Sequence, residues 1–199
     1  MNGFERRRQL KMTQIKKAAF TLFSQYGVQK VNIHDIAKKA NVSQVTIYNY
    51  FGSKEALLLD VLKTFFEEQM HFYNELLEKN ISFKEKIEHL MKNKIEVANS
   101  LNDNLYDYIL HDEGEIKNLV IQYESKHSIP FFQKFIELGK KEGVIHKDLS
   151  LETVMFFINS FTNEAYKHPE FIMNYDTRNQ VTKELLQMFF YGLAGESGG

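Results

Sequence analysis

Residues 31–54 read VNIHDIAKKANVSQVTIYNYFGSK, and this stretch decides the fold of the N-terminal part of the chain. Apolar side chains recur in it at helical spacing, and a residue that can cap a helix stands before each apolar run. The stretch therefore predicts two short helices joined by a tight turn and followed at once by the start of a third helix. This order is typical of a helix-turn-helix motif.

The first short helix is expected to begin after Asn32 and to end near Asn41. Asn32 can cap it, and Asp35, three residues later, can complete a capping box. Asn41 tolerates the left-handed conformation that often follows the C-terminus of a helix. The residues expected to share the buried face are Ile33, Ile36, Ala37 and Ala40.

Ser43 can cap the second short helix, in which Ile47 and Phe51 are expected to point inward. The other face has the chemistry of a major-groove reader, because Gln and Asn can pair with adenine, Thr can contact thymine and Tyr can reach a phosphate. A third helix then starts after Ser53, and its N-terminus favours a phosphate. The predicted DNA-binding residues are Ser43, Gln44, Val45, Thr46, Tyr48, Asn49, Tyr50 and Lys54.

The run IAKKANVSQVTIYNYFGSKEALLLDVL, residues 36–62, resembles the DNA-binding signature of the tetracycline-repressor (TetR/AcrR) family of bacterial regulators. The likeness covers about residues 12–62. Three positions depart from the family pattern: Asn41 stands where Gly is most common, Val45 where Gly or Pro is common, and Gly52 where Lys is frequent. The resemblance implies a homodimeric regulator that binds a palindromic operator in double-stranded DNA and carries a pocket for a small-molecule effector in its helical body.

Composition narrows the class of protein further. The chain has 199 residues, of which 43% are hydrophobic, and it has no Cys, so disulfides and thiolate chemistry are excluded. No apolar run approaches the length of about 18 residues that a membrane span needs, and the N-terminus lacks a signal-peptide pattern. We therefore expect a cytoplasmic protein without a membrane partner.

The net charge of −1 conceals an asymmetry along the chain. Residues 1–54 contain ten lysines and arginines against Glu5 and Asp35, a net charge of +8, so residues 55–199 carry −9. A basic head on an acidic body is expected when only the head faces DNA, since neutralisation of phosphates supplies most non-specific affinity.

The whole chain is predicted to be all-α, with a flexible arm over residues 1–10. Pro130 is expected to kink or divide one long helix. The other expected helices cover 12–26, 53–78, 83–100, 103–112, 115–141, 150–166 and 176–194. The predicted domains are an N-terminal three-helix DNA-binding domain (1–53), a C-terminal helical ligand-binding and dimerisation domain (54–194) and a disordered tail (195–199).

The body contains more aromatic residues than one small core needs, so both a ligand cavity and a subunit interface are expected. Helices 150–166 and 176–194 of two chains should form a four-helix interface. The predicted ligand-binding residues are Tyr106, Ile109, Tyr123, Phe131, Phe157 and Phe161. The predicted interface anchors are Phe157, Phe161, Leu185 and Phe189.

Two other functions stay open at this point: a helical metalloenzyme, and a helix-turn-helix module used only for protein contacts. Glu124 and His127 have the E-x-x-H spacing of di-iron bundles, but the chain lacks the second copy that such a site needs. The basic head argues against a module for protein contacts alone. No phosphate-binding loop or nucleophile motif is present. The preferred prediction is a regulator without cofactor, metal or enzymatic activity.

The expected helix 53–78 contains neither Pro nor Gly and joins the DNA-binding domain to the body. Such a helix can act as a rigid lever. A ligand that separates the helices of the body would tilt it and change the spacing of the two recognition helices on the operator. The sequence thus predicts a repressor released by a small apolar or amphipathic ligand.

Overall fold

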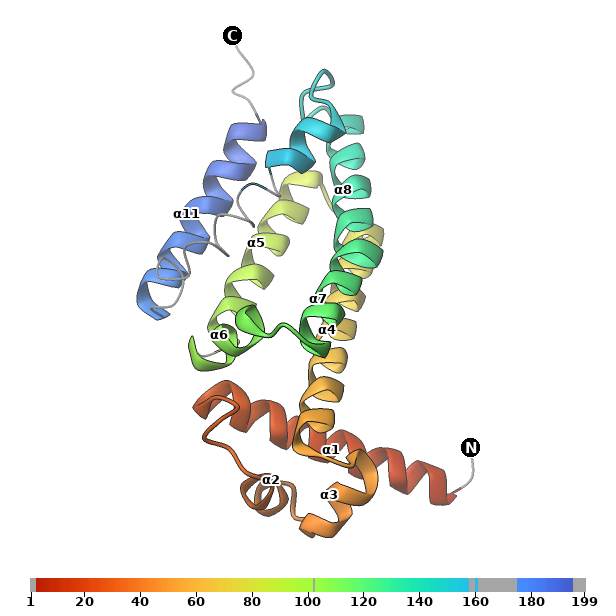
Figure 1. The fold of residues 1–199 in the computed structure, drawn as a ribbon. Coiled ribbons are helices and arrows are strands. Elements are labelled where there is room, and N and C mark those ends of the chain that lie inside the picture. The colour runs from red at the N-terminus through yellow and green to blue at the C-terminus, as the bar shows by residue number, and fades with distance from the viewer. Residues whose placement is uncertain (1–2, 102, 158–159, 161–174, 195–199) are drawn as a thin grey trace. The chain divides into compact units, whose positions relative to one another are not determined.

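The computed structural model describes residues 3–101, 103–157, 160 and 175–194, and the described residues contain helices and turns without a strand (Figure 1). The predicted all-α class is confirmed. The helices are α1 (Gly3–Tyr26), α2 (Ile33–Ala40), α3 (Gln44–Phe51), α4 (Lys54–Glu78), α5 (Phe83–Ser100), α6 (Asp103–His111), α7 (Glu115–Tyr123), a π-helical turn (Glu124–Ser128), α8 (Ile129–Lys141) and α11 (Tyr175–Ala194). Residues 151–157 are also helical.

The chain forms two compact units. Unit 1 comprises Met1–Glu68 and Leu101–Leu119, and unit 2 comprises Gln69–Ser100 and Val120–Gly199. Helices α4 and α7 each begin in unit 1 and end in unit 2. The functional division at residues 53 and 54 stays a prediction. No helix within the described ranges is both long and apolar enough to cross a membrane.

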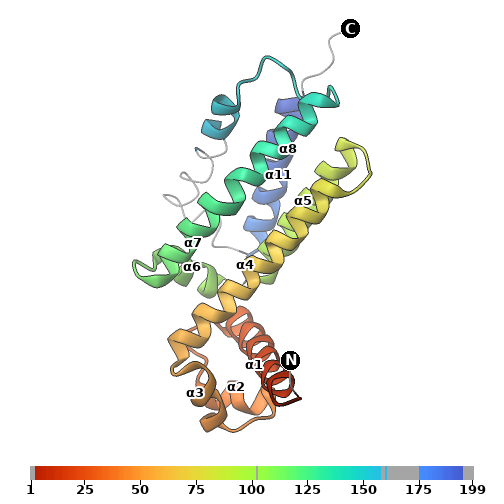
Figure 2. The same cartoon turned by 90° about the vertical axis from the view of Figure 1, so that its right-hand side faces the viewer.

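Unit 1 is built around α1, α2, α3 and the first half of α4 (Figure 2). The amide of Gln14 donates to the carbonyl oxygen of Ala40 at 2.9 Å, and the ammonium of Lys16 donates to the hydroxyl of Thr64 at 2.7 Å. These bonds fix α1 to α2 and α4. The buried core residues of these helices are Ile15, Ala18, Ala19, Phe23, Ile33, Ile36, Ala37, Ala40, Ile47, Leu57, Leu58, Val61 and Leu62.

Helix α1 begins at Gly3, so the prediction of a flexible arm was wrong for residues 3–10. The residues of this stretch are mostly good helix formers. Glu5 lies in the first turn, where a negative charge favours the helix, and its carboxylate is 3.8 Å from the guanidinium of Arg8. The arginine run is therefore held on a helix, with all three side chains exposed.

Helix α6 packs against the end of α1 inside unit 1. Gly27 ends α1 with φ +82, as the sequence predicts. A Cβ atom at this position would lie 2.6 Å from the Cβ of Asn104, so glycine also permits the close approach of α6. The loop after α1 and α6 enclose a small cavity of about 110 Å³.

Unit 2 has its own apolar core. The ring of Phe131 stacks on that of Tyr73 at 4.6 Å between centroids and lies 5.4 Å from that of Phe135. Helix α5 packs along α11. The buried residues of this core are Tyr73, Leu76, Phe83, Leu90, Phe131, Phe135, Ile136, Ile145 and Val154.

One charged side chain is buried in unit 2. Lys86 on α5 is only 3% exposed. Its ammonium donates to the backbone carbonyl oxygens of Leu76 at 2.8 Å, Leu77 at 3.0 Å and Lys79. These carbonyls stand at the C-terminus of α4, where a helix leaves acceptors without intrahelical partners and attracts a cation. Lys86 therefore caps α4.

The expected long helix 115–141 is divided, as Pro130 predicts. The π-helical turn Glu124–Ser128 separates α7 from α8, and Pro130 stands in the first turn of α8, where its missing N–H costs least. The predicted helix 103–112 ends one residue earlier, at His111. Of the predicted helix 150–166, residues 151–157 are helical; positions 158–159 and 161–166, and the predicted tail 195–199, lie outside the described residues.

Candidate nucleic-acid interface

The turn between α2 and α3 is set by the caps that the sequence predicts. The side-chain oxygen of Asn32 accepts from the backbone N–H of Asp35 at 3.0 Å, and the Asp35 carboxylate accepts from the N–H of Asn32 at 3.1 Å. Asn41 adopts the left-handed conformation, with φ 50 and ψ 50. The N–H of Val42 then donates to the carbonyl of Ala37 at 3.0 Å, which closes the end of α2.

Helix α3 presents the predicted recognition face to solvent. The hydroxyl of Ser43 accepts from the N–H of Thr46 at 3.1 Å and fixes the start of the helix. Ile47 is fully buried and anchors α3 to the core. Phe51 is half-buried. Of the predicted DNA-binding residues, Ser43, Gln44, Val45, Tyr48 and Asn49 are exposed, and Thr46, Tyr50 and Lys54 are half-buried.

Two contacts to α3 come from residues outside the sequence prediction. The guanidinium carbon of Arg8 lies 5.8 Å from the centroid of the Tyr50 ring, a cation–π geometry. The amide nitrogen of Gln44 lies 3.4 Å from Nδ1 of His34 on α2. These contacts orient two side chains of the recognition helix. The run of three arginines marks this part of α1 in the sequence, whereas nothing marks His34.

The start of α4 lies directly after α3. The hydroxyl of Ser53 accepts from the N–H of Ala56 at 3.0 Å, and Lys54 is the first residue of the helix. The pKa of the Glu55 carboxyl lies below its ordinary value because hydrogen bonds from its own backbone and from Ser53 stabilise the carboxylate. That negative charge reduces the attraction of this helix N-terminus for a phosphate, so Lys54 must supply the positive charge.

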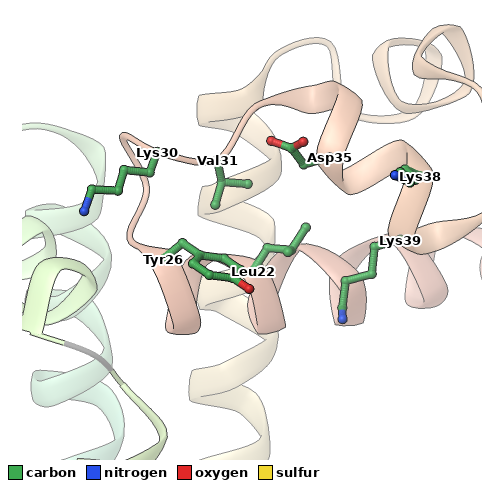
Figure 3. Close-up of a pocket in the computed structure, with 7 residues that line it drawn as sticks. All are labelled: Leu22, Tyr26, Lys30, Val31, Asp35, Lys38 and Lys39. Atoms are coloured by element: carbon green, nitrogen blue, oxygen red, sulfur yellow. The ribbon is translucent and has the colours of Figure 1, made fainter.

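A groove of about 550 Å³ lies between α1 and α2 in unit 1 (Figure 3). Figure 3 shows Leu22, Tyr26 and Val31 at its centre and the lysines at its margins. Its one carboxylate, Asp35, already accepts the capping bond from Asn32, so the margins are net positive. The lining residues are Leu22, Tyr26, Lys30, Val31, Asp35, Lys38 and Lys39. The groove extends the positive surface of the head beyond α3.

The residues predicted to bind a ligand are divided between the two units. Tyr106 and Ile109 are half-buried on α6 in unit 1. Tyr123 ends α7 and Phe131 lies in the core, both in unit 2. Phe157 ends the helix 151–157 and is 40% exposed. Phe161 lies outside the described residues.

Of the predicted interface anchors in α11, Leu185 is half-buried. The side chain of Phe189 lies outside the part of unit 2 that the structure describes. Glu124 and His127, the E-x-x-H pair, stand in the π-helical turn. Among the described residues, no three His, Asp or Glu side chains form a group that could hold a metal ion.

A capped helix-turn-helix with an exposed polar recognition helix, on a unit rich in lysine and arginine, is the DNA-binding domain of a transcription regulator. Residues 15–61 match the family described as bacterial regulatory proteins, tetR family. This match, together with the similarity to curated transcriptional regulators, supports the resemblance to the TetR/AcrR family that the sequence indicates.

The similarity of the chain to individual members extends over most of its length. The transcriptional repressor KstR2 of Rhodococcus jostii is 25% identical over 191 residues, which cover 92% of this chain and 90% of that protein. FadR of Bacillus subtilis in complex with stearoyl-CoA superposes with a TM-score of 0.64 at 20% identity, over 90% of this chain and 98% of that one. A TetR transcription regulator of Haloarcula marismortui superposes with a TM-score of 0.73 at 13% identity, over 94% of this chain and 100% of that one. These two structures share the fold.

Proposed function

We propose that this protein is a homodimeric repressor that binds a near-palindromic operator through α3 and is released by a small amphipathic ligand. The exposed polar face of α3 carries the proposal, because Gln44, Tyr48 and Asn49 take no part in the core and can reach base edges and phosphates. The net charge of +8 on residues 1–54 supports contact with phosphates. Such a protein acts in the cytoplasm, where the operator is.

Two relatives support the effector part of the proposal. KstR2 is a repressor, and FadR forms a complex with stearoyl-CoA. An apolar chain on a polar head group fits the aromatic-rich body of this protein. We therefore take stearoyl-CoA as the first probe.

A gel shift against the DNA upstream of its own gene tests the function. We expect a specific, salt-sensitive complex with this DNA, and we expect stearoyl-CoA to dissociate it. A complex of equal strength on random DNA would contradict sequence-specific repression. Absence of any complex would favour a helix-turn-helix used for protein contacts.

Base and phosphate contacts should respond differently to mutation. Asn49→Ala should weaken operator binding by about 1–3 kcal/mol and leave random DNA unaffected, because an exposed carboxamide on α3 can read a base edge. Lys54→Ala should weaken binding to both DNAs and lower the salt slope by about one unit, since it would remove one phosphate contact. Titrations at several salt concentrations measure both effects.

Lys63→Ala is the matched control for Lys54, because Lys63 is an exposed cation of the same helix α4, nine residues further from the recognition helix. Equal changes in salt slope for the two variants would show that Lys54 acts through general charge. Equal losses on operator and random DNA for Asn49→Ala would show that Asn49 reads no base.

The proposed dimer is supported by exposed apolar side chains at the C-terminal end of unit 2. Phe156, Phe157, Met188 and Tyr191 are 74%, 40%, 62% and 71% exposed in the single chain. Large apolar side chains that stay exposed in a single chain are typical of contact surfaces. We propose that a second copy of this chain covers this surface, because one recognition helix contacts too few base pairs for a specific site. Two DNA-binding domains would bind two half-sites about 34–36 Å apart, or a multiple of this distance.

Phe156→Asp should convert the dimer to a monomer at micromolar concentration, because dimerisation would bury an unpaired carboxylate. The side chain is exposed, so the fold of the single chain should be kept. Phe4→Asp on α1 is the control, since Phe4 is 70% exposed but lies in unit 1. Light scattering measures the mass. A Phe156→Asp variant that remains dimeric would show that the dimer interface does not include Phe156.

A further inference from the structure

We propose that five polar residues of unit 2, namely Gln69, Asn93, Lys94, Tyr123 and Glu124, form the head-group site of the effector. The site would take an amphipathic ligand whose head offers hydroxyl or amide N–H donors together with a carbonyl or anionic acceptor. We call these residues the polar layer. The inference rests on the proposed ligand-released repressor and names the chemistry of its ligand.

The residues of the polar layer come from α4, α5 and the end of α7 with the π-helical turn, and the ring of Tyr73 lies near both Lys94 and Tyr123. The ammonium of Lys94, on α5, lies 5.0 Å from the centroid of the Tyr73 ring on α4 and 6.0 Å from that of Phe132 on α8. Gln69 stands one turn before Tyr73 on α4 and shares its face. Asn93 precedes Lys94 on α5.

The π-helical turn supplies the other two residues. Burial raises the pKa of the Glu124 carboxyl, and the nearby positive charge of Lys94 opposes that rise. Burial also raises the pKa of the Tyr123 hydroxyl, with a further contribution from Tyr73. Both side chains are thus partly withdrawn from water beside Tyr73 and Lys94. A π-helical turn inside a helix is frequently found at a functional site.

The layer leaves hydrogen-bonding groups unsatisfied. The side-chain oxygens of Gln69 and Asn93 are buried, and neither has a hydrogen-bond partner in the described part of the chain. No carboxylate among the described residues forms an ion pair with Lys94, whose contacts are the faces of two aromatic rings. An unpaired buried acceptor is unfavourable in a folded protein, and a bound ligand or water can supply the donor that it lacks.

A ligand can satisfy these groups if it complements each of them. The oxygens of Gln69 and Asn93 need donors, and Lys94 needs an acceptor. The apolar core of unit 2 lies next to the layer, because Tyr73 stacks on Phe131. A long-chain acyl group on an amide-containing head, such as an acyl-coenzyme A thioester, offers amide N–H donors, carbonyl acceptors and an apolar tail. A free fatty acid offers the carboxylate and the tail alone.

We expect stearoyl-CoA to bind the full-length protein at least tenfold more tightly than stearate. Asn93→Leu and Gln69→Met should each weaken stearoyl-CoA binding about tenfold, while the urea midpoint of the ligand-free protein stays equal or rises because a buried unpaired acceptor is removed. Lys94→Met should also weaken binding about tenfold. Lys92→Met is its control, since the Lys92 side chain is 77% exposed on the same helix.

Operator binding by each variant verifies that it is folded, and the outcomes separate the two proposals. Loss of stearoyl-CoA affinity with retained operator binding supports the polar layer. Unchanged affinity in Asn93→Leu and Lys94→Met overturns it and leaves the ligand-released repressor standing. If the unmodified protein binds stearate and stearoyl-CoA with equal affinity, or binds neither of them, the proposed ligand class is overturned. Failure of the unmodified protein to bind operator contradicts the proposed function itself.

Discussion

Replacing Lys86 by methionine is expected to lower the free energy of unfolding by about 3 kcal/mol, because the carbonyl oxygens of Leu76, Leu77 and Lys79 lose their common donor. Methionine keeps the length and most of the volume of the side chain, so the loss reports the hydrogen bonds and the charge rather than a cavity. For a chain of this size the shift corresponds to on the order of 10 °C in the melting temperature.

Lys84→Met is the matched control, because Lys84 is exposed on the same helix α5. It should change the melting temperature by little. Urea unfolding followed by circular dichroism measures both variants. Equal stabilities of the two would show that solvent satisfies the carbonyls at the end of α4 and that Lys86 is no cap.

The helix-turn-helix could be predicted from the sequence residue by residue because local interactions determine it. The capping box of Asn32 and Asp35, the left-handed Asn41 and the cap by Ser43 each join residues no more than five apart. Periodicity then separates the buried Ile47 from the exposed Asn49. The same local rules predicted the bounds of α5 and the division at Pro130.

Features that depend on residues far apart in the chain could not be predicted. Helix α6 belongs to the compact unit of the DNA-binding head because Asn104 meets Gly27, 77 positions earlier, and no local pattern encodes that contact. The cation–π contact between Arg8 and Tyr50 likewise needs both α1 and α3 in place. Residues 3–10 were wrongly predicted to be a flexible arm, because their basic composition was given more weight than their helix propensity.

The candidate ligand site shows the same limit. Aromatic composition singled out Tyr123 and Phe131, and the structure places both in unit 2, Phe131 as a core residue stacked on Tyr73. Composition gave no sign of Gln69, Asn93 or Lys94, because a polar residue at a helical position reads as solvated unless its surroundings are known. Only the packing of the helices reveals that the side-chain oxygens of Gln69 and Asn93 are buried and that Lys94 lies against two aromatic rings.

Saturating operator DNA is expected to weaken stearoyl-CoA binding about a hundredfold, or about 2.7 kcal/mol, because ligand and operator would favour different positions of α4. The helix runs without a break over 25 residues, about 37 Å. It begins at Lys54, next to the recognition helix, and carries Gln69 and Tyr73 in its second half. A ligand that engages the polar layer would act on the same continuous helix that follows α3.

Glu68→Gly tests the lever directly, because a glycine in the middle of α4 adds flexibility at a cost of about 1 kcal/mol without removing a buried group. We expect it to leave ligand and operator affinities measured separately within about threefold and to reduce the coupling between them. Glu68→Ala, which removes the same carboxylate and keeps the helix, should preserve the coupling. Titration of stearoyl-CoA with and without saturating operator gives the coupling for each variant. Because coupling is reciprocal, identical ligand affinities in the two titrations of the unmodified protein would exclude α4 as the transmitter, whatever the variants do.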